Sequence, residues 1–64
     1  DIEEAIVLAT RVVIMSARPA RIKEVVDIDI PYPRDQETKM SDRFIELKNH
    51  IWSQVYQEYL QVRK

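Results

Sequence analysis

The chain contains no glycine among its 64 residues, and this absence restricts its fold and chemistry more than any other feature. Average glycine usage is about 7%. Glycine allows backbone conformations that other residues avoid. A phosphate-binding loop and a dinucleotide-binding fingerprint both need glycine where the backbone approaches phosphate. The sequence therefore excludes both of these nucleotide-binding motifs from the chain.

Size and composition describe one small domain without covalent or metal reinforcement. A chain of this length buries only about 60% of the surface that its unfolded form exposes. It has no cysteine, so neither a disulfide nor a thiolate zinc site can form. With 10 basic and 11 acidic residues, it lacks the basic excess that a non-specific nucleic-acid binder needs.

The sequence shows no targeting signal. No apolar run approaches the length of a membrane span. The first turn carries Asp1, Glu3 and Glu4, where a signal peptide needs cationic residues. We therefore expect a soluble, cytoplasmic chain. Because the first residue is aspartate rather than methionine, we also expect an excerpt or a processed product of a longer protein.

Residues 2–9 are predicted to form a short helix. Asp1 can cap the first backbone N–H groups, and Glu4 stands three residues later, as in a capping box. Apolar residues then follow at the spacing of one helical face, at Ile2, Ala5, Ile6 and Ala9. Because Val7 and Leu8 point elsewhere, we expect this helix to be buried on several sides.

Two antiparallel strands are predicted next, at about residues 11–16 and 21–30. The first strand holds a continuous, largely β-branched apolar run at residues 12–15, which indicates that it is covered on both faces. Pro19 favours a turn between the strands.

The second strand has an alternating pattern, which is typical of one buried and one solvated face. The buried face is expected to hold Ile22, Val26, Ile28 and Ile30, interrupted only by Glu24. The solvated face is expected to hold Lys23, Asp27 and Asp29. Pro31 and Pro33 end the strand.

A polar linker at residues 31–40 leads to a long helix at about residues 42–62. Ser41 is a good N-cap, and Asp42 favours the positive end of the helix dipole. One broad face of this helix combines Phe44, Leu47, Ile51, Trp52, Val55, Tyr59 and Val62. It is widened on one flank by Ile45, Tyr56 and Leu60.

This apolar arc is wider than a single hairpin can cover. A helix that packs on one partner needs a stripe only a little over about 100° wide. The excess indicates that the chain was shaped to pack against more protein than it contains. We therefore expect the isolated chain to self-associate, since it would otherwise expose a large apolar patch.

Five titratable residues are candidates for catalytic or metal-binding groups. Glu3 and Glu4 point about 100° apart in a first helical turn, where glutamates are common because of the helix dipole. Asp27 and Asp29 share a strand face, but two carboxylates are too few for a calcium site. His50 falls on the polar arc of the long helix, where a surface histidine is the simpler interpretation.

Two further groups of residues are candidates for binding surfaces. A local basic patch would combine Arg18, Arg21, Lys23 and Arg34, but acidic residues lie close to it in the sequence. An aromatic group on the long helix combines Trp52, Tyr56 and Tyr59, which favours core packing or a subunit contact. The sequence therefore assigns no catalytic, cofactor-binding or metal-binding residue to the chain.

The first 22 residues resemble one family of transport proteins. Residues 1–11 match the pattern Asp-x-x-Glu-Ala-x-x-Leu-Ala-x-Arg, which follows the switch histidine in ABC importer ATPases. Residues 16–22 resemble the group that energises uptake of nitrate, sulfonates, taurine and related anions. Residues 31–35 and the apolar positions of the long helix are similar to that group's C-terminal end. Ala20, Thr10 and Tyr32 depart from its usual glycine, aspartate and arginine.

The resemblance implies an α+β fragment of an α/β P-loop ATPase domain, ordered as short helix, β-hairpin and long C-terminal helix. The loops that bind ATP and Mg²⁺ would lie upstream, so the chain itself would be non-catalytic and hold no cofactor. Its partners would be the rest of the nucleotide-binding domain and the transporter's membrane subunits, at the cytoplasmic face of the membrane. The alternative is a stand-alone oligomerisation or interaction module built on the long helix. A regulatory role for the segment is a further possibility.

Overall fold

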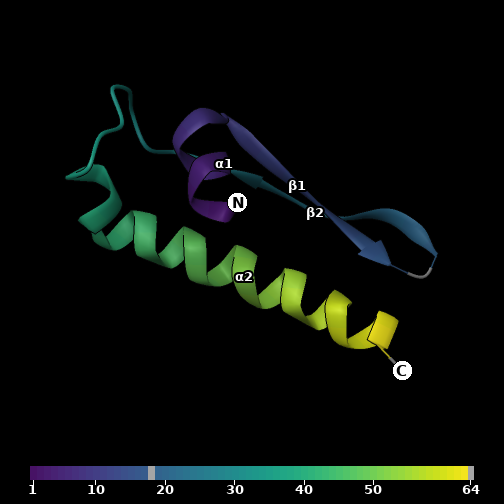
Figure 1. The fold of residues 1–64 in the computed structure, drawn as a ribbon. Helices are drawn as coiled ribbons and strands as arrows, with labels where there is room; N and C mark the ends of the chain where they lie inside the picture. Colours follow the sequence, from purple (N-terminus) through teal and green to yellow (C-terminus); the bar gives the residue numbers. More distant parts are fainter. Residues whose placement is uncertain (18, 64) are drawn as a thin grey trace.

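A computed structural model describes residues 1–17 and 19–63 and shows an elongated molecule of about 39 × 17 × 15 Å (Figure 1). The elements in chain order are α1 (Ile2–Leu8), β1 (Arg11–Ala17), β2 (Ala20–Asp27), the 3₁₀ helix η1 (Thr38–Met40) and α2 (Asp42–Arg63). The two strands form an antiparallel hairpin, and α2 runs alongside it with α1 in contact with both. The predicted α+β order of short helix, hairpin and long helix is confirmed.

Side-chain caps begin both α-helices where the sequence predicts them. The Asp1 carboxylate accepts hydrogen bonds from the backbone N–H groups of Glu3, at 2.9 Å, and Glu4, at 3.5 Å. The Ser41 hydroxyl accepts one from the Phe44 N–H at 3.3 Å and donates one to the Thr38 carbonyl at 2.7 Å. These bonds satisfy donors that the first helical turn leaves without intrahelical partners.

One hydrophobic core joins both helices to one face of the hairpin. Its buried members are Ile6, Ile14, Val26, Ile28, Phe44, Leu47 and Ile51. Each such side chain contributes about 1.5–3 kcal/mol when it is fully buried. The core therefore lies around the first half of α2, while the second half extends along the hairpin (Figure 1).

β2 ends at Asp27, which corrects the predicted strand end at Ile30. Asp27 pairs with Arg11, the first residue of β1, so residues beyond it have no opposite strand. A single further hydrogen bond joins the Ile28 N–H to the Thr10 carbonyl at 2.9 Å. Ile28 is nevertheless buried, as its place in the alternating pattern predicts.

A β-bulge in β2 corrects the predicted facing of Ile22 and Lys23. Ile14 pairs with Glu24 and Met15 pairs with Ile22, which leaves Lys23 as the extra residue. Because the side-chain period of a strand is two, one extra residue reverses the facing of every residue beyond it. Ile22 is therefore exposed instead of buried, and Lys23 extends toward α2.

The hairpin is covered on one face only, so the predicted coverage of both faces of the first strand is wrong within this chain. The opposite face, called here the outer face, carries two cross-strand pairs of exposed apolar residues. They are Val13 with Val25 and Met15 with Ile22. The α1 helix is likewise buried on one side, since Ile6 is buried and Leu8 is exposed.

The broad apolar face predicted for α2 divides into a buried and an exposed part. Phe44, Leu47 and Ile51 are buried in the core. Their predicted companions on the same face, Trp52, Val55, Tyr59 and Val62, are about half exposed. The hairpin and α1 cover only part of the helix circumference, so the remaining apolar residues face solvent.

Neither α-helix in the described part of the chain combines the length and hydrophobicity that crossing a lipid bilayer requires. No described residue has a positive φ, which agrees with the absence of glycine. Ala20 therefore opens β2 without the backbone conformation that glycine favours.

Candidate functional site

The side chain of Arg34 joins the end of α1 to the segment that follows β2. One nitrogen of its guanidinium group donates hydrogen bonds to the carbonyls of Ile6, at 2.8 Å, and Ala9, at 2.6 Å. The other terminal nitrogen donates to the carbonyls of Ile30, at 2.6 Å, and Ile28, at 3.2 Å. We call this arrangement the Arg34 anchor.

The Arg34 anchor suits both the charge and the geometry of its site. The last carbonyls of a helix lack intrahelical donors and carry partial negative charge, so a cation at that end is stabilising. Tyr32 covers the guanidinium group, which lies 4.0 Å from the centre of its ring. The Tyr32 hydroxyl also donates a hydrogen bond to the Leu8 carbonyl at 2.9 Å. Both side chains therefore hold the end of α1 against the segment that follows β2.

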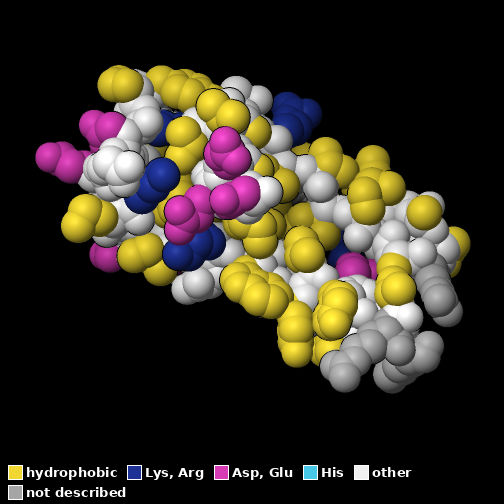
Figure 2. Space-filling model, viewed as in Figure 1, with side chains coloured by type: hydrophobic (Ala, Val, Ile, Leu, Met, Phe, Trp, Pro, Cys, Tyr) yellow, Lys and Arg dark blue, Asp and Glu magenta, His cyan; other side chains and the backbone are white. Residues whose placement is uncertain are grey.

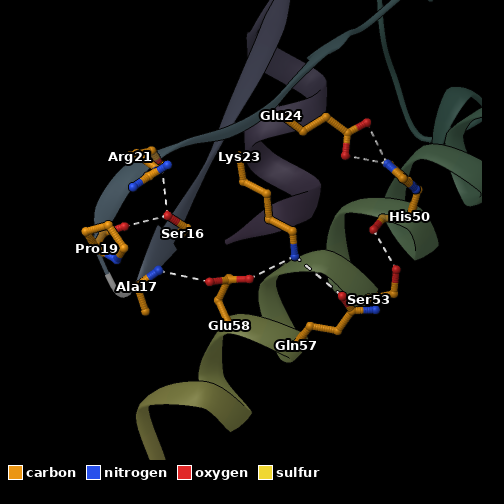
Figure 3. A network of polar contacts seen from close by, with 10 residues as sticks. All are labelled: Ser16, Ala17, Pro19, Arg21, Lys23, Glu24, His50, Ser53, Gln57 and Glu58. Carbon is orange, nitrogen blue, oxygen red and sulfur yellow. Dashed lines mark hydrogen bonds and ion pairs between the residues drawn. The ribbon is translucent and has the colours of Figure 1, made fainter.

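A second polar group joins the tip of the hairpin to the second half of α2 (Figure 3). The Glu58 carboxylate accepts hydrogen bonds from the Ala17 N–H at 2.9 Å and the Lys23 ammonium at 2.8 Å. Lys23 also lies 3.4 Å from the side-chain oxygen of Gln57. The bulge makes the Lys23 contacts possible, because it turns Lys23 toward the helix that Glu24 also faces (Figure 3).

The structure places the described members of the candidate basic patch apart from one another. Arg34 lies in the anchor at the end of α1, and Lys23 is paired with Glu58. The Arg21 side chain is exposed near the hairpin tip, and Arg18 lies outside the described residues. Two of the four cations are thus bonded within the chain at different places, so they do not form one anion-binding surface.

Four of the five candidate residues, Glu3, Asp27, Asp29 and His50, each lie within 4.0 Å of a different partner in the chain. Glu3 lies 3.3 Å from Lys48, while Asp29 lies 2.8 Å from Arg43. The Nε2 atom of His50 lies 2.9 Å from the Glu24 carboxylate. The described residues contain no group of three or more side chains able to hold a metal ion.

Arg43 lowers the pKa of Asp29 below its usual 3.8, mainly by hydrogen bonding to its carboxylate. The hydrogen bonds from Lys23 and then from Ala17 likewise lower the pKa of Glu58 below its usual 4.5. Both shifts favour the ionised carboxylate in the folded chain. They are explained by contacts within the chain and do not require a ligand.

The aromatic residues of α2 form a surface instead of a core. Trp52 and Tyr56 meet edge to face with ring centres 5.0 Å apart, and Tyr56 stacks on Tyr59 at 6.0 Å. Two open hollows lie beside these rings. One of about 500 Å³ is lined by Asn49, Trp52, Ser53 and Tyr56, and one of about 310 Å³ by Trp52, Val55, Tyr56 and Tyr59. Figure 2 shows hydrophobic side chains gathered over the second half of α2.

Sequence reasoning identified the aromatic group but missed the Arg34 anchor and the Glu58 contacts. The α1 helix ends without a basic residue in its last turn, which is a sequence signal that its cap comes from elsewhere. That signal does not identify Arg34, which lies 25 residues along the chain from Ala9.

 The contact could not be predicted because it joins segments that only the folded chain brings together.

Acid is expected to weaken the contact between the hairpin tip and α2. The folded pKa of Glu58 lies below its unfolded value, so its stabilising effect is complete above about pH 4.5 and is lost as the pH falls through the folded pKa. Urea unfolding of the wild type and of Glu58→Gln, between about pH 7 and about pH 3, measures this effect. We expect the wild type to be more stable near neutral pH and the difference to disappear in acid.

Glu37→Gln is the matched control, because the Glu37 side chain makes no cap hydrogen bond. This variant should follow the wild type across the whole pH range. A constant difference between the wild type and Glu58→Gln at every pH would contradict the assigned role of the Glu58 carboxylate.

Comparison with known proteins finds relatives among transport ATPases. The chain is 40% identical over 58 residues to a protein of Brucella melitensis that is named as an ATP-binding protein, covering 91% of this chain and 24% of the relative. It is 44% identical over 54 residues to the aliphatic sulfonates import ATP-binding protein SsuB of Bacillus cereus, covering 84% of this chain and 20% of the relative.

A third relative is an uncharacterized ABC transporter ATP-binding protein of Methanocaldococcus jannaschii. It is 41% identical over 64 residues, which cover all of this chain and 23% of the relative. The homologues of this chain are thus ABC transporter ATP-binding proteins, and the chain spans between a fifth and a quarter of their length. No protein-family profile matches the chain. No solved structure matches it either.

Proposed function

We propose that the chain is a non-catalytic, C-terminal part of the ATP-binding subunit of an ABC importer. The imported solute would be an aliphatic sulfonate or a similar small anion, such as nitrate or taurine. ATP and Mg²⁺ would bind to the rest of the subunit, and this part would supply no catalytic, cofactor-binding or metal-binding residue. The whole subunit would work with membrane subunits at the cytoplasmic face of the membrane.

The observation that carries the proposal is the uncovered outer face of the hairpin. Val13 and Val25 form a cross-strand pair there, and each is 48% exposed. Met15 and Ile22 extend the same apolar surface. A two-stranded hairpin with one apolar face in water is short of partners, because sheets of this kind become stable when both apolar faces are packed.

The similarity to longer transport ATPases agrees with this shortage of packing partners. The relative from Bacillus cereus is named for aliphatic sulfonate import, and this chain matches only 20% of it. The remaining part of such a subunit would be large enough to cover the outer face. In this arrangement the hairpin extends a larger sheet, and α2 covers the face of the hairpin opposite the outer face. The Arg34 anchor sets the position of α1.

A chimaeric protein tests the proposal directly. The matching segment of the Bacillus cereus relative is replaced with this chain, and the product is assayed for ATP hydrolysis. Growth on an aliphatic sulfonate is measured in a strain that lacks the native subunit. We expect the chimaera to hydrolyse ATP and restore growth, whereas the relative without its matching segment should do neither.

Two controls separate packing from chemistry. A chimaera with Val13→Asp and Val25→Asp should lose activity, because the charges would be buried against the rest of the subunit. The 64-residue chain alone should show no ATP turnover. Turnover by the chain alone, or a folded chimaera without ATPase activity, would contradict the proposed function.

A further inference from the structure

The exposed side of α2 carries apolar residues at the spacing of a helix-pairing seam. Ile45, Trp52 and Tyr59 are separated by seven residues, and Val55 and Val62 follow the last two after three. We call these five residues the α2 seam. Each of them is between 40% and 56% exposed, although all are apolar or aromatic. A repeat of seven with alternating steps of three and four is the pattern by which two helices pack along their length.

The α2 seam begins beside the face that packs on the hairpin and extends away from it around the helix. The core face holds Phe44, Leu47 and Ile51, all of which are buried. At 100° per residue, Trp52 lies about 100° around the helix from Ile51. The apolar surface of the helix is therefore wider than the part that is packed, and the exposed parts of the seam remain available when Phe44, Leu47 and Ile51 are buried.

We propose that the α2 seam binds the same seam of a second copy of this chain, with the two helices antiparallel. The hollows beside Trp52 and Tyr56 lie along the seam, so the surface offers both projecting rings and spaces between them. The residues that line these hollows carry no formal charge. Two copies can therefore approach there without bringing like charges together.

The available area fits a weak but specific dimer. An aromatic side chain buries about 200 Å² when fully covered, so half-exposed seam residues together offer on the order of 500 Å² per copy. Two copies would bury roughly 1,000 Å², which is at the lower limit for a specific interface. Weak, transient complexes lie at this end of the size range, and we expect a dissociation constant on the order of micromolar for such a complex.

Lys48 selects the antiparallel arrangement. It occupies the remaining position of the heptad pattern, between Ile45 and Trp52, and its ammonium group lies 3.3 Å from Glu3. A parallel pair would place Lys48 beside Lys48 of the second copy. An antiparallel pair in register places Lys48 beside Tyr59, Ile45 beside Val62, and Trp52 beside Val55. This register avoids placing the two Lys48 side chains next to each other.

Sedimentation and fluorescence of the 64-residue chain test the proposal. At about 100 μM, well above a micromolar dissociation constant, we expect a dimer that dissociates on dilution. Trp52 is the only tryptophan, so its emission should shift to shorter wavelength as the dimer forms. Val55→Lys should weaken dimerisation at least about tenfold, because it places a charge in the seam. Met15→Lys, on the outer face, is the control and should dimerise as the wild type does.

Disulfide formation between two single-cysteine variants tests the orientation. The chain has no cysteine of its own, so Ile45→Cys and Val62→Cys each introduce one thiol. An antiparallel pair should cross-link the two variants with each other when they are mixed, and neither variant with itself. Circular dichroism checks that the exposed substitutions leave the helix content unchanged.

Three results would overturn the proposal. The first is a chain that remains monomeric at about 100 μM, whether folded or unfolded. The second is an association that Met15→Lys abolishes and Val55→Lys leaves intact, since the outer face would then be responsible. The third is self-linking of each cysteine variant, which indicates a parallel pair. Because these tests use only this chain, they are independent of the ATPase assay in the chimaera.

Discussion

Replacement of Phe44 by alanine is expected to leave the chain largely unfolded at 25 °C. Phe44 is 0% exposed and packs in the core with Ile6, which is also fully buried. Truncation of a buried phenylalanine costs about 3–5 kcal/mol, because it removes apolar burial and leaves a cavity. A chain of this length has a total stability of roughly 3–10 kcal/mol, so the loss is comparable to the whole.

Urea unfolding followed by circular dichroism measures this loss. Met40→Ala is the matched control, because Met40 lies nearby in η1 and is 77% exposed. Its unfolding free energy should stay within about 0.5 kcal/mol of the wild type. A Phe44→Ala variant as stable as this control would show that the core does not form around Phe44.

Replacement of Arg34 by alanine is expected to release α1 from the rest of the chain. The substitution removes hydrogen bonds to carbonyls of two segments and the contact with the Tyr32 ring. Hydrogen bonds to a charged group contribute about 1.5–3 kcal/mol each. Because water can donate to some of the carbonyls that lose Arg34, we expect the free energy of unfolding to fall by about 2–4 kcal/mol. A helix of seven residues is unstable alone, so α1 should unfold first.

Hydrogen exchange of the Ala9 N–H, which donates a hydrogen bond to the Ala5 carbonyl at 2.9 Å, reports on the unfolding of α1.

 Its exchange should be faster in Arg34→Ala than in the wild type, even where the rest of the chain stays folded. Arg34→Lys should give an intermediate result, because lysine keeps the charge but cannot reach both sets of carbonyls at once. Arg21→Ala, at an exposed arginine, is the control and should leave the exchange unchanged. Unchanged exchange in Arg34→Ala would contradict the role of the anchor.

The order of the elements could be predicted because its signals are local. Asp1 and Ser41 satisfy donors within the next three residues, so each cap is visible in a few letters of sequence. The period of the apolar residues separates the helices from the strands in the same way. Ile6, Phe44 and Leu47 were accordingly expected on packing faces, and all three are buried.

The facing of β2 near the hairpin tip could not be predicted, because a bulge leaves no clear mark in this sequence. Alternation alone places Ile22 with Val26 and turns Lys23 to the other side. The extra residue at Lys23 reverses that assignment and brings its ammonium group to Glu58. The partner lies 35 residues away, so only the packing of α2 on the hairpin brings the two together.

By itself, the sequence determined which segments are helical or extended, where the helices begin, and that glycine-dependent phosphate binding is absent from this chain. These properties depend on residue type and on neighbours within about one helical turn. Only the tertiary structure decided that Arg34 anchors α1, that Phe44 is buried while Trp52 is half exposed, and that one face of the hairpin is uncovered. The physical reason is that burial and long-range hydrogen bonds depend on which distant segments pack together, and the period of a helix or strand does not specify its partner.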